Sequence, residues 1–284
     1  MLITIFVLKV TKNQNIDLSC KICIIRSMKI GDLKMRNKYL ENLCKIEFVV
    51  TNACTGRCIH CSAGTPCDDG QNIDARLASQ AVEKIASLYD IKTVMTFGGE
   101  PLLYPDTVFE IMNTAKKLGI LKRQVITNGF FSENPDKIRK VAQKLCECGV
   151  NDLLLSVDAF HQRTIPLDVV KMFAKELISV GVPVKLQPAW LVKSEHKNPY
   201  NEETHRILDS FSNLDIGCND GNIVFPEGNA KKYLAEYFAQ NVPDNPYVEN
   251  KEDVRCVSFS ANGDVFSSNF YKQDILEILY EYKP

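Results

Sequence analysis

Three closely spaced cysteines are the residues of this chain best suited to chemistry. Cys54, Cys58 and Cys61 follow a C-x3-C-x2-C spacing and are called the cysteine triplet below. Three thiolates at this spacing can hold one iron–sulfur cluster, and a four-iron cluster held in this way keeps one iron without a protein ligand. A metal with such an open position can bind and activate a small molecule. The triplet therefore predicts a catalytic [4Fe–4S] cluster.

A structural zinc site is the main alternative, because the triplet and His60 together form a Cys3His ligand set. Two features count against zinc. His60 is the immediate neighbour of Cys61, which is a poor spacing for two ligands of one ion. Zinc ligands also usually come as two separated pairs, whereas these residues form one tight group. We favour the cluster and keep a non-catalytic zinc or iron–sulfur binding module as an alternative.

A second motif, Gly98-Gly99-Glu100, follows an apolar run at residues 93–97 that predicts a strand. Glycines at the end of a strand allow a small molecule to approach the backbone closely. The triplet and this motif together resemble the radical S-adenosylmethionine (SAM) superfamily. The resemblance implies an enzyme in which SAM is cleaved reductively at a single [4Fe–4S] cluster. The resulting 5′-deoxyadenosyl radical would take a hydrogen atom from the substrate.

The resemblance also implies which residues contact SAM. Gly98 and Gly99 would present backbone atoms to the methionyl ammonium group, which Glu100 would help to fix. Without the triplet, these three residues would indicate only a strand-to-loop turn. His60 occupies a position that is usually aromatic, so its ring could stack on the adenine. A histidine that is hydrogen-bonded within its own loop is the alternative.

Polar residues further along the chain are expected at the same site. Ser156 is our choice for the ribose contact, and Asp158 lies on the same face of the same predicted strand. Asp158 could instead cap the turn that follows it. Asn128 is expected either to contact SAM or to be a turn residue in the left-handed αL conformation. His161 could contact SAM or the substrate, or could face solvent.

A motif at residues 225–230 resembles the Pro-x-Gly-Arg-Ala motif that follows the sixth strand in this superfamily. The resemblance implies backbone contacts to adenine near Phe225. Asn229 stands where the family usually has arginine, so any charge role of that arginine is lost in this chain.

Strands and helices alternate six times along most of the chain. Apolar runs predict strands at residues 47–50, 93–97, 124–127, 153–158, 184–188 and 222–225. Helical periodicity and terminal prolines and glycines predict helices at residues 75–89, 105–119, 135–148, 167–180, 202–211 and 230–240. This alternation predicts an α/β fold with a parallel sheet. The resemblance implies an open, partial (β/α)6 TIM-like barrel, in which chemistry collects at the carboxyl ends of the strands.

The pattern changes after residue 241. Two short apolar runs at residues 256–260 and 264–267 flank Asn262-Gly263, which predicts a β-hairpin, and a helix is expected at 273–282. This tail resembles a truncated form of the extension in SPASM-type radical SAM enzymes, which holds auxiliary clusters. Only Cys218 and Cys256 lie beyond the fifth strand, and two cysteines cannot hold a four-iron cluster. We therefore expect no auxiliary cluster and a hairpin that covers the mouth of the barrel.

We expect three regions. Residues 1–43 form an N-terminal extension that could be dispensable, 44–241 form the barrel, and 242–284 form the C-terminal hairpin and helix. The apolar start of the chain lacks the basic segment and cleavage site of a secretion signal. Cys20 and Cys23 form a lone C-x2-C pair, which we interpret as two ordinary thiols.

Bulk properties narrow the classes of partner and compartment. The net charge of −1 over 284 residues, with scattered basic residues, argues against a nucleic-acid partner. Eleven cysteines in a chain of this length indicate a reducing compartment and metal binding, so we expect a cytoplasmic protein. No stretch approaches the ~20 apolar residues of a membrane span, so no membrane association is expected.

The expected partners follow from the resemblance. They are a peptide or small-molecule substrate and an electron donor such as flavodoxin or ferredoxin. The SPASM-like tail favours a peptide or protein as the substrate. A glycyl-radical-activating enzyme is the alternative within the superfamily, and the length of chain beyond the sixth strand argues against it.

Overall fold

The computed structural model describes residues 36–67, 70–239 and 242–284. Its longer strands and helices follow the predicted alternation. The strands are β1 (Lys45–Val49), β2 (Thr93–Phe97), β3 (Lys122–Thr127), β4 (Asp152–Ser156), β5 (Val184–Gln187), β6 (Ala189–Trp190), β7 (Gly217–Cys218), β8 (Asn222–Ile223), β9 (Cys256–Phe259), β10 (Asp264–Val265) and β11 (Ser268–Asn269). The α-helices are α2 (Ala75–Leu88), α3 (Pro105–Lys117), α4 (Pro135–Glu147), α5 (Leu167–Ser179), α6 (Pro199–Asp209), α7 (Gly228–Tyr233) and α8 (Ile275–Glu281).

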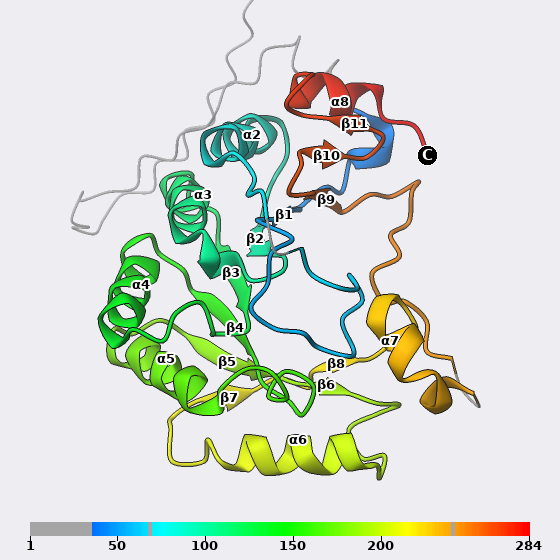
Figure 1. Cartoon of the computed structure of the whole chain (residues 1–284). Coiled ribbons are helices and arrows are strands. Elements are labelled where there is room, and N and C mark those ends of the chain that lie inside the picture. Colours follow the sequence, from blue (N-terminus) through cyan, green and yellow to red (C-terminus); the bar gives the residue numbers. More distant parts are fainter. Residues whose placement is uncertain (1–35, 68–69, 240–241) are drawn as a thin grey trace, which may run out of the picture. The chain divides into compact units, whose positions relative to one another are not determined.

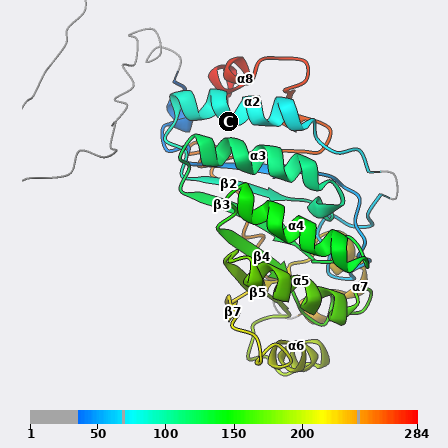
Figure 2. The same ribbon diagram turned by 90° about the vertical axis from the view of Figure 1, so that its left-hand side faces the viewer.

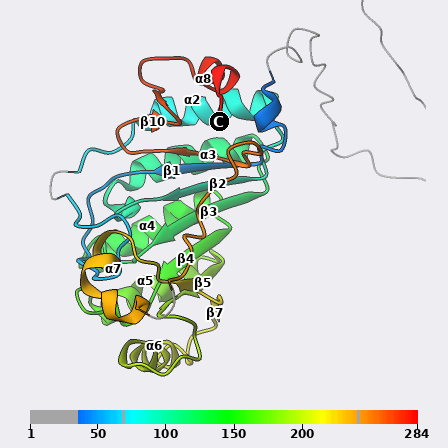
Figure 3. The same cartoon turned by 90° about the vertical axis from the view of Figure 1, so that its right-hand side faces the viewer.

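Seven of the strands form one sheet in the order β7-β5-β4-β3-β2-β1-β9. Every neighbouring pair in this sheet is parallel. Helices α2 to α5 lie along one face of the sheet (Figures 1 and 2), and Figure 3 shows the other face, along which the segment between α7 and β9 runs. The predicted α/β fold, a parallel sheet consistent with a partial barrel, is confirmed.

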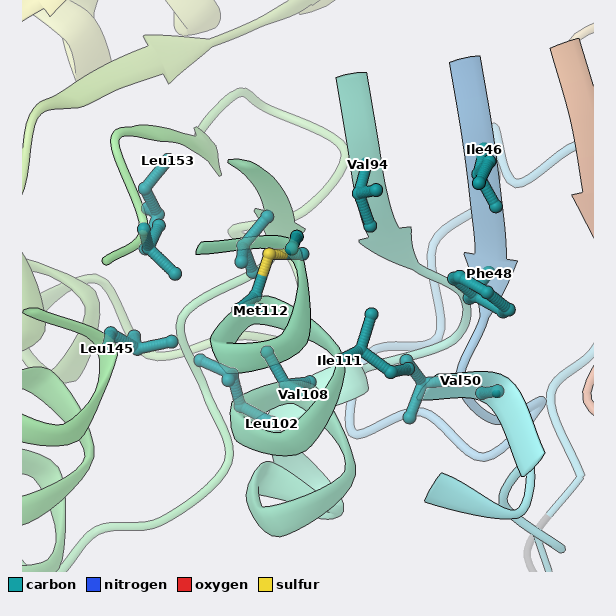
Figure 4. Close-up of a cluster of buried hydrophobic side chains, with 14 of the residues drawn as sticks. Ile46, Phe48, Val50, Val94, Leu102, Val108, Ile111, Met112, Leu145 and Leu153 are labelled. Carbon is teal, nitrogen blue, oxygen red and sulfur yellow. The ribbon is translucent and has the colours of Figure 1, made fainter. Parts of the chain in front are cut away.

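The covering helices form where caps and apolar faces coincide. In α4, the side chain of Asn134 accepts hydrogen bonds from the backbone N–H groups of residues 136 and 137, and Pro135 starts the helix with its fixed φ. The buried residues of α4 are Ile138, Val141, Ala142 and Leu145, which recur at helical spacing. Figure 4 shows the same kind of face on α3, where Val108, Ile111 and Met112 point toward the strands. Burial of these faces holds the strand ends in fixed positions.

The sixth strand differs from the prediction. Residues 222–225 were expected to extend the main sheet, but Asn222–Ile223 instead pairs in parallel with Ala189–Trp190 in a separate two-stranded sheet. The main sheet is extended by Gly217–Cys218 next to β5. Pro188 separates β5 from β6 because it has no N–H to donate to a ladder. The helix predicted at 230–240 is also shorter, and α7 is followed by a 3-10 turn at Ala235–Phe238.

The C-terminal tail is also arranged differently from the prediction. Cys256–Phe259 does not pair with the next run but joins the main sheet beside β1, where Phe259 stacks on Phe48 with ring centroids 4.8 Å apart. The turn around Asn262-Gly263 forms, and the hairpin comes one strand later, between Asp264–Val265 and Ser268–Asn269. The observed pairing differs from the predicted one because the open edge of the main sheet buries Val257 and Phe259 fully. A two-stranded hairpin could not bury them in this way.

Two further predictions concern particular regions. The predicted Cys20–Cys23 pair and most of the extension at residues 1–43 lie outside the described residues. Among the helices that the structure describes, none is long and apolar enough to cross a membrane.

Candidate functional site

One cavity of about 560 Å³ lies at the carboxyl ends of the strands. All three cysteines of the triplet line it, as do Gly98, Gly99, Asn128, Ser156 and Phe225. His60, Asp158 and His161 also contribute to its wall. Parallel strands deliver their carboxyl ends to the same edge, so residues far apart in sequence meet there. Of the residues predicted to bind the cofactors, only Glu100 is absent from this wall.

The Gly-Gly pair holds the end of β2 against the chain that leads into the triplet. The N–H of Gly99 donates to the carbonyl of Thr51 at 2.7 Å, and the N–H of Glu100 donates to the carbonyl of Ala53 at 2.8 Å. A Cβ at position 99 would lie 2.0 Å from the oxygen of Ala53. Only glycine allows this approach, because any side chain would push the two backbones apart. The residue after Ala53 is Cys54, so this contact fixes where the triplet begins.

Glu100 lies behind the cavity wall and contacts the end of β3. Its carboxylate is fully buried and accepts hydrogen bonds from the N–H of Leu102 at 2.9 Å, the hydroxyl of Thr127 at 2.7 Å and the N–H of Asn128 at 2.8 Å. Burial, which disfavours the charged form, raises the pKa of Glu100 to about 7. These contacts brace β2 against β3. The role of Glu100 in fixing the methionyl ammonium group of SAM stays a prediction.

Asn128 contacts the triplet itself. Its side-chain amide donates to the sulfur of Cys54 at 3.5 Å and to the hydroxyl of Thr55 at 3.2 Å. The N–H of Gly56 reaches the same sulfur at 3.3 Å. The side-chain oxygen of Asn128 accepts from the N–H of Phe130, which closes the turn after β3. The left-handed residue of this turn is Gly129, with φ of 75°, so the prediction that Asn128 itself adopts that conformation is wrong. Asn128 instead contacts a predicted ligand of the cluster. Hydrogen bonds to cluster sulfurs are one of the means by which proteins set cluster potentials.

The triplet fits the ligand set that a [4Fe–4S] cluster requires. Burial, followed by weaker effects that include the charges of Glu100 and Cys61, raises the pKa of Cys54 to about 11. Burial, Asp158 and the other two cysteines raise the pKa of Cys58 well above its ordinary value. The raised pKa values of Cys54 and Cys58 favour their protonated forms in the absence of a positive charge. Bound iron would supply that charge, because thiols that bind a metal lose their protons.

Asp158 organises the opposite wall of the cavity. One carboxylate oxygen accepts from the backbone N–H groups of Phe160 and His161, both at 2.9 Å, which confirms the predicted capping role. The other oxygen bonds Nδ1 of His161 at 2.8 Å and the N–H of Ala189 at 3.0 Å. Burial acts to raise the pKa of Asp158, but His161 and these hydrogen bonds outweigh it and hold the pKa below its ordinary value. The buried carboxylate therefore orients an imidazole at the cavity.

His60 packs beside this pair. Its ring lies 4.7 Å from the ring of Phe160 and 4.8 Å from that of His161, measured between centroids. Burial, followed by the nearby His161, lowers the pKa of His60 to about 4, so its ring is neutral at physiological pH. His60, Asp158 and His161 offer ligand atoms within 4.8 Å of one another. Four donors already occupy the oxygens of Asp158, which favours a hydrogen-bonded Asp158–His161 pair over a second metal centre.

The cavity also contains Tyr247, which the sequence analysis did not identify, and Cys67. Tyr247 comes from the segment between α7 and β9 and lines the cavity, where its ring meets that of Phe225 with centroids 5.9 Å apart. No local motif marks Tyr247, because the contact arises from the path of the tail. Cys67 lines the same cavity from an exposed position, and its pairing with Ala53 is a single β-bridge.

None of the residues of the C-terminal hairpin lines the cavity, so the expectation that it covers the mouth is wrong.

The curated proteins that resemble this chain include GTP 3′,8-cyclases. A probable GTP 3′,8-cyclase from Saccharolobus islandicus is 27% identical over 226 residues, which cover 72% of this chain and 67% of that protein. A GTP 3′,8-cyclase from Clostridium botulinum is 27% identical over 158 residues, which cover 54% of this chain and 49% of that protein. The chain therefore spans two thirds of one relative and about half of the other.

Solved structures share the fold at low sequence identity. Streptococcus suis SuiB bound to SAM has a TM-score of 0.55 and 14% identity, covering 85% of this chain and 66% of that chain. Native anSMEcpe with bound SAM also has a TM-score of 0.55 and 14% identity, covering 84% of this chain and 80% of that chain. The sequence pattern that defines the radical SAM superfamily matches residues 48–230. The chain therefore belongs to the radical SAM superfamily, an enzyme class that uses a [4Fe–4S] cluster and SAM.

Proposed function

We propose that this protein binds a [4Fe–4S] cluster at the cysteine triplet and SAM beside it, and that it acts on a peptide or protein. The triplet would hold the cluster, and with SAM bound the cluster would supply the chemistry of reductive SAM cleavage and hydrogen abstraction from the substrate. The observation that carries the proposal is the shared cavity. The triplet, the Gly-Gly pair and the carboxyl ends of β3 and β4 all contribute to its wall.

Each side of the cavity has a separate task in this proposal. The triplet would hold the [4Fe–4S] cluster, and the backbone of Gly98 and Gly99 with the hydroxyl of Ser156 would orient SAM. Asn128 donates to Cys54 and so stabilises its thiolate form. His161 is held through Nδ1 by Asp158, which leaves Nε2 as the ring nitrogen that can exchange a proton with the substrate. An external electron donor such as flavodoxin or ferredoxin would supply the electron.

The charge of the cavity supports a peptide over a nucleotide. Among the described residues that line the cavity, none is lysine or arginine, and Asp158 contributes a carboxylate. A triphosphate normally requires cationic side chains or a metal to balance its charge. The neutral amides of a peptide require none. The curated relatives named as GTP 3′,8-cyclases give the competing function, and the solved structure of anSMEcpe with SAM and the Kp18Cys peptide gives a peptide-bound fold neighbour.

Anaerobic assays test the two parts of this proposal separately. For the cofactor part, the protein is reconstituted with iron and sulfide and incubated with SAM and dithionite, and 5′-deoxyadenosine is measured by mass spectrometry. We expect its formation, and we expect none after Cys58→Ala. Folded wild type that carries iron but never cleaves SAM would refute the cofactor part.

For the substrate part, the reconstituted protein is supplied either with GTP or with synthetic peptides. The sequences of these peptides are taken from genes that neighbour the gene of this protein. We expect GTP neither to bind nor to stimulate formation of 5′-deoxyadenosine. A peptide should change in mass only in the presence of SAM and reductant. GTP binding together with formation of a cyclised nucleotide would replace the peptide proposal with the function of the curated relatives, without affecting the cofactor part.

A further inference from the structure

We propose that Asn229 is a positioning residue for the cluster. It holds the stretch from Cys58 to Gly64, within the loop of residues 54–67, in the geometry that the ligands need. This inference rests on the proposed cluster at the triplet. The side-chain amide of Asn229 donates to the carbonyl of Cys58 at 3.1 Å and to the carbonyl of Gly64 at 3.2 Å. Its backbone N–H donates to the carbonyl of Cys61 at 2.9 Å. One residue from a distant part of the chain therefore contacts two of the three ligand residues.

The loop that Asn229 contacts has little support of its own. No helix or strand forms between residues 54 and 67. Inside the second half of the loop, the backbone bonds are those from the N–H of Cys61 to the carbonyl of Cys58 at 3.3 Å and from the N–H of Gly64 to the carbonyl of Cys61 at 3.1 Å. Asn229 contacts the same carbonyls, so it ties together the two turns that present Cys58 and Cys61.

Gly228 allows this contact. A Cβ at position 228 would lie 2.3 Å from the oxygen of Ser62 and 2.5 Å from the oxygen of Cys61, so only glycine lets α7 approach the loop so closely. The backbone of Gly228 also has φ of 53°, in the left-handed region that glycine adopts readily. Close approach of two backbones is a specific arrangement, which the amide of Asn229 then secures.

The residues that follow Asn229 are anchored in a second apolar cluster. Its neighbour Ala230 and Leu234 in the turn after α7 are fully buried in this cluster with Phe160, Leu191 and Val224. Phe160 lies within the turn that Asp158 caps, and its N–H donates to the carboxylate of Asp158. The amide of Asn229 is therefore anchored to the wall that carries His161. Asn229 therefore lacks the charge of the arginine that the family usually has at this position, but it contacts the loop that carries the cysteine triplet.

The test compares two variants of Asn229 with a control nearby. Asn229→Asp has the same size and keeps the backbone bond to Cys61, but a carboxylate cannot donate to the carbonyls of Cys58 and Gly64. Asn229→Ala removes the side chain altogether. Asn245→Ala is the control, because Asn245 donates to the carboxylate of Glu227 at 2.9 Å beside the same helix without contacting the loop.

Iron retention is the measurement, and it does not depend on catalysis. Each protein is reconstituted anaerobically, and iron release to a chelator is followed by absorbance, with the thermal midpoint of the metal-free protein as a check on folding. We expect both Asn229 variants to lose iron about 10- to 100-fold faster than the wild type, the effect typical of residues that orient metal ligands. The control should match the wild type. Because Asn229→Asp conserves volume, it decides the result if Asn229→Ala fails to fold.

The outcomes separate this inference from the proposed function. Wild type that binds about four irons, with Asn229→Asp releasing them at the wild-type rate, overturns the positioning role alone. Wild type that binds no iron overturns the proposed cluster itself. Equal acceleration in Asn245→Ala also overturns the inference, because it would assign the effect to α7 in general rather than to the amide of Asn229.

Discussion

Replacing Gly99 by alanine tests whether this glycine is a structural contact or only a contact to SAM. The new Cβ would lie 2.0 Å from the oxygen of Ala53 and 2.6 Å from its carbonyl carbon, and backbone atoms cannot rotate away as a flexible side chain could. Crowding of this kind costs about 1–3 kcal/mol. Separation of the strands would also weaken the two backbone hydrogen bonds at 2.7 and 2.8 Å, each of which costs about 1–3 kcal/mol if it is left unmade in a buried place.

These costs sum to about 3–9 kcal/mol but are not fully additive, so the free energy of unfolding should fall by about 3 kcal/mol. For a chain of this size, that corresponds to a decrease of roughly 6–12 °C in the melting temperature. Iron binding should fall as well, because displacement of Ala53 moves Cys54. Thermal unfolding of the metal-free protein and iron analysis after reconstitution measure the two effects.

Gly217→Ala is the matched control. Position 217 lies in an exposed strand, and a Cβ there would meet only one side-chain atom, at 3.9 Å. We expect this variant to melt within a few degrees of the wild type or slightly above it, because alanine restricts the unfolded chain. Wild-type melting and iron content in Gly99→Ala, with a loss of SAM binding alone, would refute the structural role and return Gly99 to a purely cofactor-binding one.

Three further predictions concern the metal and a buried acid. Alanine at any position of the cysteine triplet should remove most of the iron and all SAM cleavage, whereas Cys67→Ala should be nearly silent; an equal requirement for Cys67 would show that the ligand set is wrong. The double change Cys218→Ser and Cys256→Ser should leave about four irons per chain, one cluster's worth, because these residues lie on opposite edges of the sheet; close to eight irons in the wild type, falling to four in this variant, would establish an auxiliary cluster. The pKa of Glu100 is raised from 4.5 to about 7, so its stabilising contribution is full below pH 4.5 and is lost as pH rises through 7. Between pH 5 and 8, the wild type should lose about 2–3 kcal/mol of unfolding free energy relative to Glu100→Gln, measured by urea unfolding of the metal-free proteins; parallel pH profiles would contradict the buried position of Glu100.

The sequence predicted the parts of the fold whose signals are local. The first five strands of the sheet and the helices between them form where short apolar runs, amphipathic periodicity, prolines and glycines coincide. The exceptions are segments of two to four residues, such as β7, β8 and β9. Their choice of partner depends on which sheet edge is open, which a short run of sequence does not specify. Cys256–Phe259 accordingly joined β1 rather than the turn beside it.

The candidate site divides in the same way. The triplet and the Gly-Gly pair carry their chemistry in residue type and spacing, so the sequence alone is enough to recognise them. The roles of Glu100, Asn128 and Asn229 depend instead on partners brought together by the fold: Glu100 with β3, Asn128 with Cys54, and Asn229 with the loop of Cys58. A hydrogen bond needs donor and acceptor within about 3 Å. For residues as far apart in the chain as Asn128 and Cys54, only tertiary packing determines whether that distance is reached.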